Sequence, residues 1–169
     1  MDLRYPIGIF EKPANVTAAD RANWIADLES LPSTVRMHVE RLGPGGLDTP
    51  YRPGGWTARV VVHHLADSHM NSFVRFRLAL TEDRPTIKPY DEAAWALLAD
   101  SQTMDPAHSM AILDGLHARW VVMMRSLSED DYKRAFLHPE LGEVGLDHAL
   151  ALYSWHCRHH AGHLGLIAA

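Results

Sequence analysis

The chain has 169 residues, of which 47% are hydrophobic and 22% are charged, as expected for one globular domain over residues 1–169. Sixteen basic residues against 21 acidic ones give a net charge of −5 with histidine neutral. This balance excludes a strongly basic binder of nucleic acid or anionic membranes. The single cysteine, Cys157, excludes an internal disulfide and a cysteine-rich metal site.

The amino-terminal segment and the hydropathy pattern bear on location. No apolar run approaches the roughly 18–20 residues that a membrane span needs. The first residues, MDLRYPIGIFEKP, lack the long apolar core of a signal peptide. We therefore expect a soluble cytoplasmic protein with no membrane partner.

Residues 1–16 contain two prolines and a glycine and predict an irregular amino-terminal arm. Thr17 is a good N-cap, and Asp20 is placed to complete a capping box. Apolar residues then recur at helical spacing over residues 24–42, which predicts a first long helix. Pro32 should kink this helix or split it in two.

The middle of the chain alternates between loops and helices. Residues 43–55 carry five glycines and three prolines and predict a loop with at most a short turn. Thr57 should cap a second long helix that runs to about Leu80. Residues 81–104 predict a long connection with one small helix. This connection is either a lid over a cleft or a plain surface segment.

The last third of the chain predicts two more long helices. Asp105 and Pro106 should begin a helix that runs to about Leu127. Residues 128–146 are polar and predict a second long connection with a short helical turn. Asp147 should cap a final helix that continues to the carboxyl terminus.

This pattern predicts an all-α four-helix bundle with two long connections that carry short helices. No stretch alternates apolar and polar residues for long enough to predict a strand. The long connections also permit an unusual helix order.

Histidine is the one residue type in clear excess. The chain has 12 histidines, and histidine is both the commonest metal ligand and the usual acid or base near neutral pH. Two short clusters hold seven of them: His63, His64, His69, His156, His159, His160 and His163.

The final helix carries two histidine pairs at i, i+4 spacing. His156 and His160 lie within about 40° of each other on the inward face, since each residue advances the helix by about 100°. Such a pair can present two imidazoles to one ion. The pair His159 and His163 is also partly inward and competes, but the geometry favours His156 and His160.

A third ligand should come from a facing helix. His64 lies on the apolar stripe of the second helix and is the better inward residue, whereas its neighbour His63 lies on a more polar face. Three imidazoles leave an open position for water or substrate on zinc, and nickel or iron would also accept them. Asp67 is a candidate to orient a ligand ring from behind.

A second interpretation stays open at this point. A histidine on an apolar helix face is more often a hydrogen-bonded core residue than a ligand, and i, i+4 pairs also arise by chance. Cys157 lies next to the inward face and is expected to be a small packed residue rather than a ligand or nucleophile.

The run LDTPYRPGGWTARVVVHHLADSHMNSFVRFRLALTEDRPTIKPYDEAAWALLADS closely resembles the DinB-like superfamily, in particular its YfiT-type branch. The early YPIG, the LHARW of the third long helix and the terminal WHCRHHAGHL fit the same branch. The resemblance implies a four-helix bundle, often homodimeric, with one divalent ion per chain, zinc or nickel. By this resemblance, the ion is held by His64, His156 and His160.

The branch is described both as metal-dependent hydrolases and as bacillithiol transferases. The resemblance therefore implies an enzyme that uses its metal to activate water or a low-molecular-weight thiolate for a small-molecule substrate. No glutamate lies beside a ligand as in a zinc peptidase helix, so that class is disfavoured. The alternative function is a non-catalytic, dimerising, metal-binding module of a stress response.

Overall fold

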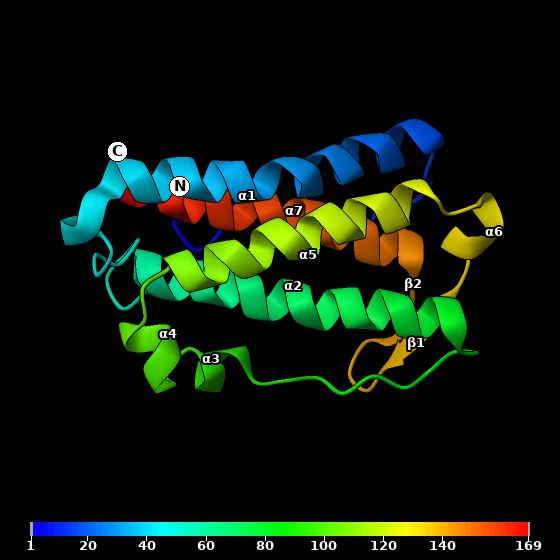
Figure 1. The fold of residues 1–169 in the computed structure, drawn as a ribbon. Coiled ribbons are helices and arrows are strands. Elements are labelled where there is room, and N and C mark those ends of the chain that lie inside the picture. The colour runs from blue at the N-terminus through cyan, green and yellow to red at the C-terminus, as the bar shows by residue number, and fades with distance from the viewer. Residues whose placement is uncertain (1, 169) are drawn as a thin grey trace.

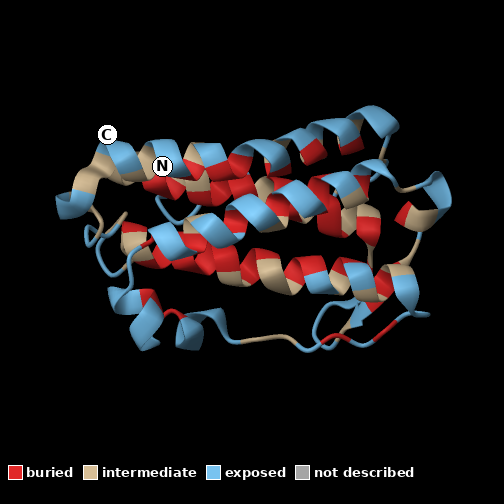
Figure 2. Ribbon diagram, in the orientation of Figure 1, coloured by how far each residue is buried: buried red, intermediate tan, exposed pale blue. Residues whose placement is uncertain are grey.

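Four long amphipathic helices build the molecule in the computed structural model, which describes residues 2–168. They are α1 (Ala18–Gly46), α2 (Ala58–Thr81), α5 (Ala107–Arg125) and α7 (Leu146–Ala168). The buried face of each helix turns toward a common interior, as Figure 2 shows. The predicted all-α four-helix bundle is therefore confirmed. No helix among the described residues has the length and apolarity needed to cross a membrane.

The order of the helices is up-down-down-up. In Figure 1 the colour gradient shows α1 and α7 running one way and α2 and α5 running the other. Both α5 and α7 pack against α1, and the same two helices pack against α2, so consecutive helices α1 and α2 lie diagonally across the bundle. Because α2 and α7 are antiparallel neighbours, the first half of α2 lies beside the last half of α7.

Parallel neighbours α2 and α5 require a connection that returns along the length of the bundle. Residues 82–106 provide it and carry two short helices, α3 (Glu92–Trp95) and α4 (Ala99–Thr103), where the sequence predicted one. The N–H of Ile87, near the start of this connection, donates to the carbonyl of Leu137 at 3.0 Å. This hydrogen bond fastens the segment to the connection between α5 and α7.

The connection between α5 and α7 contains structure that the sequence analysis missed. After the short helix α6 (Glu129–Tyr132), an antiparallel hairpin is formed by β1 (Ala135–His138) and β2 (Gly142–Gly145). Phe136 pairs in register with Val144, and both side chains are buried. Four-residue strands are too short to show the alternating pattern that predicts a strand.

The helix starts agree only in part with the predictions. Thr17 and Asp20 form the predicted capping box, and the Thr57 hydroxyl caps α2 by accepting from the Val60 N–H. The prediction that Asp147 caps the last helix is wrong, because α7 already begins at Leu146. Strand β2 leads directly into the helix there, so Asp147 lies in the first turn.

Of the two effects expected of Pro32, a kink or a split of the first helix, the split does not occur. Helix α1 continues through Pro32 and is interrupted at Gly43 (φ 61°, ψ 177°), the first residue of the predicted loop, after which one short helical turn ends at Gly46. Proline lacks an N–H, so it leaves the carbonyl four residues earlier without its helical donor. That carbonyl, of Leu28, accepts from the His117 Nδ1–H instead, at 2.6 Å.

A largely buried cation holds the start of α7 against α1. The Arg21 guanidinium contacts Asp147 through two hydrogen bonds of 2.6 and 3.0 Å and Glu129 through a third of 2.6 Å. It also lies over the Tyr132 ring, 4.4 Å from its centroid. One side chain of α1 thereby fixes α6 and α7.

Arg21→Ala is expected to lower the free energy of unfolding by about 2 kcal/mol, because it leaves a partly buried carboxylate without its counter-charge. Urea unfolding followed by circular dichroism measures the change. Arg36→Ala is the matched control on the same helix, since its ion pair with Asp114 is exposed and should contribute much less. Equal losses in both variants would contradict this role for Arg21.

Candidate metal centre

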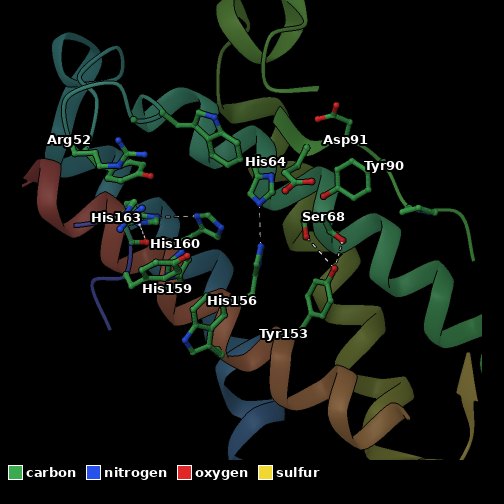
Figure 3. Close-up of a pocket in the computed structure, with 18 of the residues that line it drawn as sticks. Arg52, His64, Ser68, Tyr90, Asp91, Tyr153, His156, His159, His160 and His163 are labelled. Atoms are coloured by element: carbon green, nitrogen blue, oxygen red, sulfur yellow. Dashed lines mark hydrogen bonds between the residues drawn. The ribbon is translucent and has the colours of Figure 1, made fainter. Parts of the chain in front are cut away.

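A cleft of about 930 Å³ opens where the first half of α2 meets the last half of α7. This volume lies within the range of small-molecule sites. Figure 3 shows His64 in the lining between Arg52 and His163 on one side and Tyr90 on the other. Helices α2 and α7 supply the floor, and the two loops that flank α2 supply much of the wall.

Three imidazoles from these two helices converge in the floor. His64 of α2 and His156 and His160 of α7 each offer a ring nitrogen, and the three nitrogens lie within 4.8 Å of one another. The Nε2 atoms of His64 and His156 are 3.2 Å apart. Two nitrogens bound to one tetrahedral zinc ion at about 2.05 Å would be about 3.4 Å apart. The donor set therefore fits a divalent transition metal.

The local environment keeps these rings neutral. Burial lowers the pKa of His64 to about 4, with repulsion from the neighbouring histidines adding to the shift. Burial, together with repulsion from neighbouring histidines, also lowers the pKa of His156 and of His160 well below the ordinary value. Neutral imidazole keeps a lone pair on one nitrogen, which is the form that binds a metal.

A second group of histidines shares one member with the first. The ring nitrogens of His159, His160 and His163 also lie within 4.8 Å of one another. However, the Nε2–H of His163 donates to the Arg4 carbonyl at 3.3 Å, and its Nδ1 lies 3.3 Å from Nδ1 of His160. With both nitrogens of His163 engaged, this ring is better placed to orient His160 than to bind a metal.

A further pair of histidines lies behind His156. The His156 Nδ1 is 3.0 Å from Nε2 of His69, and the His69 Nδ1 is 2.9 Å from Nε2 of His117. The side chains of His69 and His117 are 0% and 1% exposed. Both ring nitrogens of His69 are therefore occupied by other imidazoles.

Aromatic side chains enclose the mouth of the site. Trp56 packs against the His64 ring with a centroid distance of 4.7 Å, and Tyr51 stacks on His163 at 3.9 Å. On the opposite wall Tyr90 is contributed by the 82–106 connection, and burial raises its pKa. The connection thus forms part of the cleft wall.

Other candidates lie apart from the three nitrogens. His63 contacts Ser109 Oγ at 2.8 Å and the Met104 carbonyl at 3.1 Å, so it fastens α2 to neighbouring segments. Within residues 2–168, the Asp67 carboxylate makes no hydrogen bond to a histidine, and burial raises its pKa to about 6. Cys157 is buried.

Sequence reasoning missed the contacts that His69, His117 and Trp56 make around the three histidines. The available signal was the position of His117 in the apolar stripe of its helix, where a polar ring needs a buried partner. Its partners lie on two other helices, α1 and α2, and local spacing does not show how those helices pack against α5.

The fold and the site together define a class: four-helix bundle proteins in which histidines of two neighbouring helices meet in an open cleft. The chain belongs to the DinB superfamily, whose family model matches residues 27–164. The resemblance found in the sequence is thereby confirmed.

Similar proteins are found among both sequences and solved structures. YfiT of Bacillus subtilis is 48% identical over 165 residues, which cover 97% of this chain and 93% of YfiT. A Bacillus licheniformis relative is 49% identical over 163 residues, covering 96% and 93% of the two chains, and both names propose metal-dependent hydrolase activity.

The solved structure of YfiT matches with a TM-score of 0.95 and 47% identity over 99% of this chain and 96% of that one. It is described as a probable metal-dependent hydrolase with an unusual four-helix bundle topology. The four-helix bundle protein TT2238 matches with a TM-score of 0.56 and 20% identity, over 86% and 95% of the chains, and supports the fold alone.

Proposed function

We propose that this chain is a metal-dependent enzyme, a hydrolase or a low-molecular-weight-thiol S-transferase, that holds one divalent ion on His64, His156 and His160. The observation that carries the proposal is the convergence of three neutral imidazoles in the floor of an open cleft. The names of the relatives support metal dependence and hydrolysis. An ion bound there would supply a Lewis acid that makes a water or a thiol more acidic.

Each part of the cleft has a role in this proposal. The three ligand rings carry no charge, so they leave the full charge of the ion available to an anionic group of the substrate. Trp56 shields the His64 ring from solvent on one side. Arg52 and Tyr90 lie on opposite sides of the cleft (Figure 3), where they can bind polar groups of a small molecule.

The choice between hydrolysis and thiol transfer depends on how the nucleophile loses its proton. The residues next to the three ligands in the sequence include no carboxylate, so an adjacent base like that of a zinc peptidase is missing. A water bound to zinc has a pKa of about 7, whereas a thiol that coordinates the ion would be deprotonated outright. A site of this kind therefore suits a thiol better, and we place transfer ahead of hydrolysis.

The alternative, a non-catalytic metal-binding module, calls for a site closed to substrate. The open cleft supports the enzyme instead. Zinc or nickel as the ion, a homodimer and a cytoplasmic location remain part of the proposal.

Alanine substitutions test the ligand set. His64→Ala, His156→Ala and His160→Ala should each lower bound metal from about one ion per chain to a small fraction, because two imidazoles hold an ion far more weakly than three. Elemental analysis after dialysis measures the content. His108→Ala, at an exposed position on α5, is the control, and His159→Ala should retain the ion. Full metal content in all three ligand variants would refute the assignment.

The reaction is tested by offering both kinds of substrate to the zinc- or nickel-loaded protein. A small thiol with a chlorinated or epoxide electrophile should give conjugate above the uncatalysed rate, and a chelator should abolish the excess. Simple esters and amides report hydrolysis in parallel. Ester or amide turnover without conjugate formation would reverse the order of the two reactions, and no turnover of either kind would favour the binding module.

A further inference from the structure

A chain of hydrogen bonds crosses the bundle behind the cleft and involves all four long helices. It runs from His156 of α7 to His69 of α2, then to His117 of α5, and ends at the Leu28 carbonyl of α1. The three successive distances are 3.0, 2.9 and 2.6 Å. We call this row the histidine relay.

The direction of the relay is set at its inner end. A carbonyl oxygen only accepts, so the Nδ1 of His117 must carry the hydrogen. A neutral ring has one N–H, which makes the His117 Nε2 an acceptor, and the same reasoning puts the hydrogen of His69 on its Nδ1. The Nε2 of His69 is then an acceptor for the Nδ1–H of His156.

The direction of the relay determines which nitrogen of His156, at the cleft end of the row, carries the lone pair. With its hydrogen on Nδ1, His156 has its lone pair on Nε2, and this is the atom that lies 3.2 Å from Nε2 of His64. The opposite direction would leave two acceptors facing each other at the Leu28 carbonyl. A cationic ring would allow that reversal, but charge is disfavoured at side chains that are 0% and 1% exposed.

Pro32 explains why a helix carbonyl is free to end the relay. In an ordinary helix the Leu28 carbonyl would accept from the N–H of residue 32. Proline has no N–H, and its ring crowds that carbonyl. The relay thus uses an acceptor that an unbroken α1 would have satisfied internally.

We propose that His69 and His117 are positioning residues that fix the tautomer of His156, so that its Nε2 presents a lone pair to the metal centre. The role rests on the assignment of His156 as a ligand in the proposed function. Outer partners of this kind set the orientation and basicity of a metal-binding imidazole. Here the partners are two further imidazoles and a backbone carbonyl.

Nitrogen-15 NMR of the metal-free protein tests the direction without any substitution. Long-range proton–nitrogen spectra of histidine-labelled protein distinguish ring nitrogens that carry a hydrogen from those that carry a lone pair. We expect His117, His69 and His156 each to be protonated at Nδ1 and bare at Nε2. A metal-free His156 protonated at Nε2 would overturn the proposal.

Zinc affinity, measured by competition with a chromophoric chelator, tests the consequence. His117→Phe should weaken binding about 10- to 100-fold and let the tautomers of His69 and His156 mix. His63→Phe is the matched control, because His63 is a buried histidine of α2 that contacts Ser109 and Met104; it should bind zinc like the parent protein. Unchanged affinity in a folded His117→Phe protein would overturn the proposal.

The two readouts separate this inference from the proposed function. The tautomers are read without an ion, so an error in the ligand assignment would appear in the metal content of His156→Ala and leave the spectra as expected. An error in the relay would appear in the spectra of the unsubstituted protein.

Discussion

The antiparallel contact of α2 with α7 is the constraint on which the site depends. It brings His64 from one helix to His156 and His160 of the other and leaves their ring nitrogens within 4.8 Å. Burial lowers the pKa of all three rings, to about 4 at His64, and so favours their neutral form. A neutral and crowded group of lone pairs is costly in a protein interior unless each ring finds a partner. The surrounding structure supplies those partners.

The partners come from two features that would by themselves destabilise the fold, a proline inside a helix and imidazoles buried in the core. A proline inside α1 removes a helical hydrogen bond, yet the carbonyl that it frees accepts from His117. Two fully buried imidazoles occupy core positions where aliphatic side chains are usual, yet each is hydrogen-bonded. The up-down-down-up order makes this possible, because all four long helices then contribute one group to the row. The proline in α1 and the order of the helices thus supply the hydrogen-bond partners behind the proposed metal ligands.

The sequence contained the parts of this arrangement that depend on local spacing. Apolar residues every three or four positions predicted the four helices, and the inward angles predicted that His156, His160 and His64 would share one space. The sequence did not predict the β1–β2 hairpin, because strands of four residues are too short to show a clear alternation of apolar and polar residues. The sequence did not predict the row of hydrogen bonds behind His156, because His117 and Leu28 are 89 residues apart and only packing brings them together. Asp67, the residue that the sequence offered to orient a ligand ring, makes no hydrogen bond to a histidine among residues 2–168, and the Nδ1 of His156 instead lies 3.0 Å from Nε2 of His69.

Anomalous diffraction at the zinc edge measures directly whether three imidazoles from two helices hold one ion. Crystals grown with zinc should show a single strong anomalous peak about 2.0–2.1 Å from the Nε2 atoms of His64, His156 and His160. A peak between His159 and His163, or at carboxylates of the cleft wall, would contradict the account.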